Sequence, residues 1–293
     1  MRKIITKIKE KVKAVIEILN RNEMRILPGQ LAFYLLMSFI PIIVLVALIT
    51  SRITENVDFI ELVSSGIPAS IAEMLKGIVN SVSSYDNFTF LTICYIFLAM
   101  NGPTSIIYVT NSLYELKQEN YFKTKIKAFF MTIIIVLILL FLLIIPILGD
   151  LIIDVVFTLF FYTEFILDYI PIYKILVIVL TFLVVFIGID LIYIIAPNKR
   201  GSIKTTYKGA LFTTISWIIA TEIFSFYVTN IAKYDQLYGN FANILVLLLW
   251  VYFLAYLFVF GIILNKQKYL TYEKVNLRSK KITEEKNENK KKC

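Results

Sequence analysis

Histidine is missing altogether from this sequence of 293 residues. Its absence excludes histidine-based acid–base catalysis, histidine-containing triads and the commonest protein ligand of transition metals. Only two cysteines occur, Cys94 inside an apolar run and Cys293 at the last position. This pair cannot build a disulfide framework or a thiolate metal site within one chain. We therefore predict no catalytic residues, no metal site and no cofactor.

Charged residues are scarce as well, at 17%, whereas 58% of the residues are apolar and the mean hydropathy is +0.76. These values lie outside the range of soluble domains. A bilayer core about 30 Å thick needs about 20 apolar residues in a helix, and several stretches reach that length. They lack the period-two alternation of membrane β-barrels. The sequence therefore predicts an all-α, polytopic integral membrane protein.

Six apolar stretches are long enough to be transmembrane helices. They cover residues 30–50, 88–107, 128–148, 172–195, 210–227 and 244–264. Lysine and arginine gather in alternate connections, with eight in residues 1–27, four in 114–127, four in 197–208 and ten from 265 onward. Because basic connections stay in the cytoplasm, this pattern predicts that both termini face the cytoplasm.

The net charge of +9 raises the question whether the protein binds nucleic acid. Its positive residues are distributed as topology signals on one side of the membrane, not as a stripe interleaved with exposed aromatic residues. We therefore predict no nucleic-acid partner. The basic face instead favours anionic lipid headgroups on the cytoplasmic side, and a homo-oligomer is left open.

Three regions follow along the chain. Residues 1–27 have the spacing of a basic amphipathic helix lying on the membrane surface, with an ordinary packed helix as the alternative. Residues 28–266 form the six-helix transmembrane domain, and 267–293 form a basic, disordered cytoplasmic tail. The outer connections are predicted to add two short helices in 52–87. Residues 151–170 are interpreted as an interfacial or re-entrant segment, with a seventh span as the alternative.

Two acidic residues lie within the predicted spans, and such residues are functional candidates because burying them is costly. Glu222 neighbours a helical stripe of Thr214, Thr221 and Ser225. It is either a protonated acid hydrogen-bonded between helices or a proton or cation site on a transport route, and we weigh these readings evenly. For Asp190, nearer the inner interface, a structural role is favoured.

Asn101 and the pair Gly102-Pro103 interrupt the second span. Proline removes a backbone donor, so we expect a kink or break that frees carbonyl groups. Broken helices often surround transporter binding sites, but ordinary kinks are more frequent. Pro41 and Pro146 are interpreted as simple bends.

Four segments carry a family resemblance: "GQLAFYLLMSFIPIIVLVALI", "NGPTSIIYVTNSLYEL", "IYIIAPNKRGSIKTTYKGALFTTISW" and "FSFYVTNIAKYDQLYGNFANILVLLLWVYFLAYLFVFGIILN". In them the sequence resembles the YihY/BrkB family of bacterial inner-membrane proteins, formerly called ribonuclease BN. The matching positions are Gly29, Pro41, Asn111, Pro197, Gly209, Tyr227, Tyr238, Gly239, Trp250, Gly261 and Asn265. Ile263 stands where the family usually has an acid, so a role tied to that carboxylate is not carried over.

The resemblance implies six helical spans with cytoplasmic ends, without a settled activity. A transporter or flippase for a lipid or amphipathic solute is the first hypothesis, with a cavity lined by Asn101, Glu222 and the hydroxyl stripe. No ATP-binding loop occurs, so a gradient or a partner would supply energy. A non-transporting scaffold for envelope partners is the alternative. A ribonuclease is least favoured, because the chain has no histidine and no carboxylate group suited to Mg²⁺.

Overall fold

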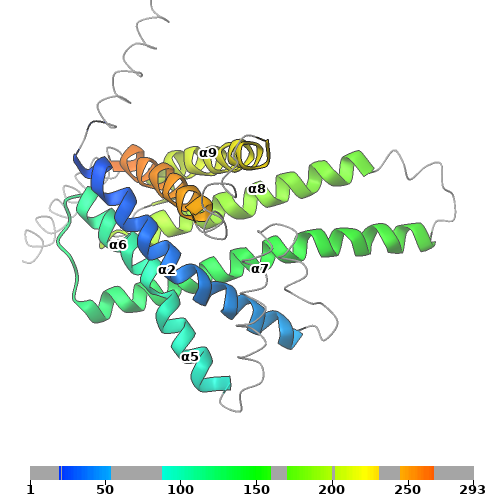
Figure 1. Ribbon diagram of the computed structural model, residues 1–293, viewed down its shortest axis with the longest axis horizontal. Coiled ribbons are helices and arrows are strands. Elements are labelled where there is room, and N and C mark those ends of the chain that lie inside the picture. Colours follow the sequence, from blue (N-terminus) through cyan, green and yellow to red (C-terminus); the bar gives the residue numbers. More distant parts are fainter. Residues whose placement is uncertain are drawn as a thin grey trace, which may run out of the picture.

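The computed structural model describes residues 20, 22–53, 88–159, 170–199, 202–230 and 245–266. Regular structure within these ranges is helical throughout (Figure 1). The helices are α2 (Asn22–Ile53), α5 (Phe88–Ala99), α6 (Asn101–Leu113), α7 (Tyr121–Leu159), α8 (Ile170–Ile195), α9 (Ile203–Asn230) and a helix over Leu245–Lys266, which we call the C-terminal helix. The all-α prediction is confirmed for this part of the chain.

Five segments of the described chain are long and apolar enough to cross a membrane. They are Asn22–Ile49, Thr92–Leu113, Tyr121–Leu142, Val177–Ile195 and Leu245–Lys266. Each corresponds to one of the six predicted spans. The remaining prediction, 210–227, falls on α9, which is helical but is not one of the five and contains Lys204, Lys208 and Glu222. A sixth crossing therefore stays a prediction.

The helices differ from the predicted bounds mainly at their ends. α2 begins at Asn22, so residues 22–27 belong to this helix. α7 has 39 residues and continues through Pro146 to Leu159, so residues 151–159 extend the third helix and do not form a separate segment. At 1.5 Å per residue α7 is about 58 Å long, nearly twice the bilayer core. The predictions for 1–19, 54–87 and 267–293 lie outside the described residues.

The predicted interruption of the second span is confirmed. α5 ends at Ala99, Met100 forms a turn, and α6 begins at Asn101. Pro103 has no N–H to donate to the carbonyl of Ala99, which explains why the helix breaks one turn before the proline. By contrast α2 continues through Pro41.

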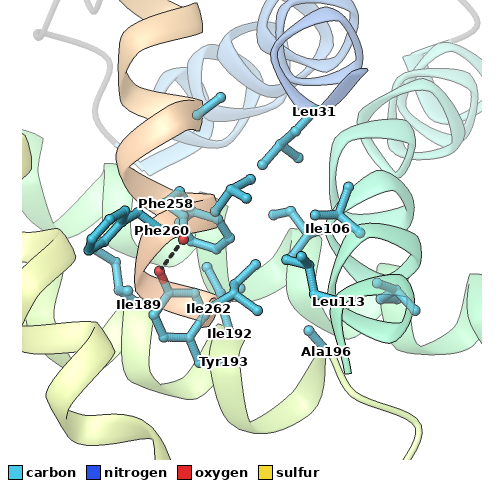
Figure 2. Packing of buried hydrophobic residues seen from close by; sticks show 14 of the residues in the cluster. Leu31, Ile106, Leu113, Ile189, Ile192, Tyr193, Ala196, Phe258, Phe260 and Ile262 are labelled. Atoms are coloured by element: carbon cyan, nitrogen blue, oxygen red, sulfur yellow. Dashed lines mark hydrogen bonds between the residues drawn. The ribbon is translucent and has the colours of Figure 1, made fainter. Parts of the chain in front are cut away.

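In Figure 1 the first residues of α2, α7 and α9 lie at the same side of the molecule as the last residues of α6, α8 and the C-terminal helix. α2 packs on α5 and α6, α6 on α7, α7 on α8, and α8 on α9. The largest apolar core lies between α2, α6, α8 and the C-terminal helix (Figure 2). Leu31, Ile107, Tyr193 and Ile262 are among its most buried members.

A hydrogen-bonded brace joins the end of α6 to the turn after α8. The amide of Asn111 accepts a bond from the backbone N–H of Asn198 at 2.9 Å and donates to its Oδ1 at 2.9 Å. Lys127 of α7 donates to the carbonyl of Pro197 at 3.0 Å. Glu115, in the left-handed region with a φ of 57°, closes α6 and pairs with Lys266 at 2.7 Å. These bonds fix four helix ends relative to one another.

α9 and the C-terminal helix cross where each has a glycine. A Cβ atom at Gly209 would overlap the carbonyl oxygen of Gly261 and the side chain of Asn265. A Cβ atom at Gly261 would overlap the hydroxyls of Thr213 and Tyr193. Small residues at a helix crossing allow two backbones to approach closely, which is the usual packing device of membrane helices.

Gly261→Ala should therefore destabilise the folded protein by about 1 to 3 kcal/mol, because the added methyl group overpacks this crossing. The measurement is the thermal unfolding midpoint of the purified protein in detergent. Gly29→Ala is the matched control, since a Cβ atom there would meet only the ring of Tyr252 at 3.8 Å. Equal midpoints for the two variants would show that the crossing is not tightly packed.

Asn111→Ala should cost about 1 to 3 kcal/mol, because it leaves the part-buried polar groups of Asn198 without their partner. Gln30→Ala is the comparison variant, since it also removes a side-chain amide, but at an exposed position in the interior of α2. The same unfolding assay checks both variants. A wild-type midpoint for Asn111→Ala would mean that the apolar core holds the helix ends without the brace.

Candidate functional site

The candidate site is a cluster of polar groups where α8, α9 and the C-terminal helix meet. Each helix contributes residues spaced three or four apart, which places them on one face. They are Asp190 and Tyr193 from α8, Thr206, Gly209 and Thr213 from α9, and Phe258 (through its carbonyl), Gly261 and Asn265 from the C-terminal helix. We call this set the polar seam.

Tyr193 ties the three helices together. Its side chain is 1% exposed, and its hydroxyl donates to the backbone carbonyl of Phe258 at 2.8 Å (Figure 2). The same hydroxyl lies 2.8 Å from Oγ1 of Thr213. A phenol has one proton, so Thr213 is the donor in the second bond. Tyr193 is therefore a fixed structural part of the polar seam.

Asn265 reaches across the glycine crossing. Its Oδ1 accepts a hydrogen bond from the backbone N–H of Gly209 at 2.8 Å. That bond fixes the orientation of the amide, because exchanging the two side-chain atoms would point Nδ2 at another donor. Nδ2 is buried and has no hydrogen-bond partner among the described residues. The polar seam thus contains a buried donor group that is still available.

Asp190 supplies an acceptor group that complements the open donor of Asn265. It is 7% exposed and lies near Thr206, whose hydroxyl donates to the carbonyl of Ser202 at 3.3 Å. Its Oδ1 is buried without a partner in the described part of the chain. Thr206 and Gly209 lie on the same face of α9, one turn apart, so Asp190 and Asn265 both lie against that turn. The polar seam therefore combines a buried carboxyl with an open acceptor and a buried amide with an open donor.

This arrangement can hold a proton or a small polar species within the membrane domain. A carboxyl group in such surroundings is stable when it is protonated or compensated by a bound cation. The described residues contain no group of three or more acidic or cysteine residues of the kind that holds a metal ion. A buried carboxyl of this kind can take up and release a proton.

The described residues predicted around Glu222 differ in burial along α9. Thr214 is fully buried and donates to the carbonyl of Ala210 at 2.9 Å, whereas Thr221 and Glu222 are exposed. The side chain of Ser225 lies outside the described residues. The predicted hydroxyl stripe is therefore divided, and the buried acid is Asp190.

Asn101 has a different partner. Its Oδ1 accepts a bond from Nζ of Lys125 at 3.3 Å, and that ammonium lies 5.6 Å from the ring centre of Tyr121. Asn101 thus belongs to a contact between α6 and α7. Its partners differ from those of Asp190.

The family-motif positions serve mainly in packing. Gly209, Gly261 and Asn265 form the crossing, and Asn111 with Pro197 belongs to the brace. Pro41 is buried within α2, Trp250 packs against the main core, and Tyr227 is exposed. A Cβ atom at Gly29 would lie 3.8 Å from the ring of Tyr252, and Tyr238 and Gly239 lie outside the described residues.

Sequence reasoning missed Tyr193, Thr206 and Thr213 as members of the site. The available signal was spacing: Tyr193 follows Asp190 by three residues and so shares its face, and Thr206, Gly209 and Thr213 repeat that spacing. Lys125 as partner of Asn101 had no local signal, because 24 residues separate the two.

Comparison with known proteins shows which family this chain resembles over its length. The family described as "Virulence factor BrkB" matches residues 15–287. The putative ribonuclease-like protein YfkH of Bacillus subtilis is 28% identical over 84% of this chain and 91% of its own length. A UPF0761 membrane protein of Alteromonas mediterranea is 35% identical over 24% of each chain, and one of Pseudomonas paraeruginosa is 32% identical over 25% of this chain and 18% of its own.

No solved structure matches this chain significantly. The family match extends over nearly the whole sequence and includes every helix described above. The resemblance seen in the sequence motifs is thereby confirmed. This chain is a membrane protein that belongs to the BrkB family.

Proposed function

We propose that this protein is a transporter- or flippase-like protein that moves a lipid or amphipathic solute across the bacterial cytoplasmic membrane. In this proposal α9 is the sixth crossing helix, and both termini are cytoplasmic. The polar seam is the part that changes state during transport. Asp190 takes up and releases a proton, and a gradient or a partner supplies the energy.

One observation carries the proposal: the carboxyl of Asp190 is buried, and one of its oxygens has no partner among the described residues. An acidic residue at membrane depth costs about 2.5 to 3.5 kcal/mol on insertion scales. The neighbouring Thr206 offsets only part of that cost. A buried carboxyl with an open acceptor is suited to binding and releasing a proton.

The basic residues support a lipid as the transported class. Lys123, Lys204 and Lys208 are exposed near the beginnings of α7 and α9, which lie at the same side of the molecule (Figure 1). A basic residue near a membrane surface attracts anionic headgroups by about 1 kcal/mol. We propose that this face gathers anionic headgroups as the protein's lipid partners.

A non-transporting scaffold is the second candidate, and the tight bonds of the polar seam favour it. Tyr193, Thr213 and the oxygen of Asn265 are all satisfied by contacts between helices. Trp217 adds a bond from Nε1 to the carbonyl of Leu254 at 2.9 Å. In this view the polar residues hold the helices together, and the open groups of Asp190 and Asn265 have no role in transport.

We do not propose a ribonuclease, although the printed name of the Bacillus subtilis relative contains that word. The sequence has no histidine for acid–base chemistry. In the described part of the chain no acidic cluster forms a site for divalent cations.

Asp190→Asn should reduce the rate at which fluorescent phosphatidylglycerol crosses reconstituted vesicles by about tenfold or more, equivalent to about 1.4 kcal/mol of barrier. The amide keeps the size of the side chain but cannot exchange the proton. Crossing is measured by dithionite quenching of the outer leaflet. The wild-type rate should also vary with pH, and this dependence should be lost in the variant.

Glu222→Gln is the matched control, because it makes the same carboxyl-to-amide change at an exposed position. Its crossing rate should stay close to the wild-type value. Unfolding midpoints confirm that both variants are folded, and Asp190→Glu should restore part of the rate. A folded Asp190→Asn protein with wild-type lipid movement would favour the scaffold. A wild-type protein that moves no lipid would refute the flippase proposal.

A further inference from the structure

The first turn of α9 directs three donors at one backbone carbonyl. The oxygen of Ser202 accepts a bond from the backbone N–H of Thr205 at 2.7 Å and another from Oγ1 of Thr205 at 2.6 Å. Oγ1 of Thr206 is the third donor, at 3.3 Å. A carbonyl oxygen has two lone pairs, and the two bonds from Thr205 are the short ones. The bond from Thr206 is therefore surplus, because Ser202 stays satisfied without it.

The surplus donor lies beside the acid of the polar seam. α8 packs on α9, and Asp190 lies near Thr206. Both side chains are buried, and Oδ1 of Asp190 has no hydrogen-bond partner among the described residues. A hydroxyl group donates one bond and accepts others, and its proton rotates to suit its neighbours. The proton of Thr206 can thus turn from Ser202 to Asp190 without a change in the backbone.

Other titratable groups on the neighbouring helices are committed elsewhere or exposed. Tyr193 of α8 donates its one proton to a backbone carbonyl, and Lys266 of the C-terminal helix has an ion-pair partner. Lys127 of α7 donates to the carbonyl of Pro197. On α9 itself, the exposed basic residues near this turn are Lys204 and Lys208. The hydroxyl of Thr206 is thus a donor that lies near Asp190 and can be released without loss elsewhere.

We infer that Thr206 is a positioning residue that accommodates both protonation states of Asp190. When the acid is protonated, its O–H donates to Oγ1 of Thr206, and the Thr206 proton stays on the carbonyl of Ser202. When the acid is ionised, the Thr206 proton turns to the carboxylate, and Ser202 keeps its two bonds from Thr205. The first turn of α9 is intact in both states.

This inference rests on the proton role proposed for Asp190, but its test does not require that lipid moves. Infrared difference spectra of the full-length protein in phosphatidylglycerol vesicles are recorded in acidic and in alkaline buffer. The bands of Asp190 are those that Asp190→Asn removes. Thr206→Val keeps the shape of the side chain and removes its hydroxyl. The C=O stretch of the protonated acid and the stretches of the carboxylate should both shift in this variant, because each form loses a hydrogen bond.

Thr214→Val is the matched control. Thr214 is buried on the same helix and donates to the carbonyl four residues earlier, as Thr206 does. It should leave the Asp190 bands at their wild-type positions. Thr206→Ser keeps the hydroxyl and should do the same, while unfolding midpoints show that all variants are folded.

Two results would overturn the inference. One is a folded Thr206→Val protein whose Asp190 bands stay in place, since the hydroxyl would then make no bond to the acid. The other is a wild-type spectrum in which Asp190 is in the same protonation state in both buffers. Shifted bands in a protein that moves no lipid would uphold the inference and refute only the transport proposal.

Discussion

The close crossing of α9 and the C-terminal helix at Gly209 and Gly261 is the contact on which the polar seam depends. In a bilayer, helices gain little from hydrophobic burial against each other, so packing of small residues and interhelical hydrogen bonds hold them together. Only without side chains at both positions can Asn265 reach the N–H of Gly209 and Tyr193 reach the carbonyl of Phe258. The crossing thereby creates a buried polar environment beside Asp190.

The helices were largely predictable, because the signals for them are local. Apolar runs located five of the spans, and Pro103 predicted the break before α6. The extent of α7 was not predictable in the same way. The span was predicted to end at residue 148 and to be followed by an interfacial or re-entrant segment, yet the helix continues to Leu159. Charges mark where the membrane ends, but the backbone can stay helical beyond it, because each helical bond is made within the segment.

The candidate site was predictable only in part. Asp190 and Glu222 stand out in sequence because each interrupts an apolar run, but a helical wheel gives angles without saying which neighbours cover them. Thr214 and Thr221 lie at nearly the same angle, yet only Thr214 is buried, because the adjacent helices cover part of the length of α9. Tyr193 was overlooked because its ring is typical of a membrane core and only its hydroxyl joins the polar seam.

The energies of the interhelical hydrogen bonds can be compared with the cost of burying Asp190. Interhelical hydrogen bonds in membrane proteins contribute about 0.6 kcal/mol each on average, so the four that link Tyr193, Asn265 and Trp217 to neighbouring helices amount to about 2.4 kcal/mol. That sum is about the insertion cost of one acidic residue. These interhelical bonds are therefore large enough, taken together, to offset the cost of burying Asp190.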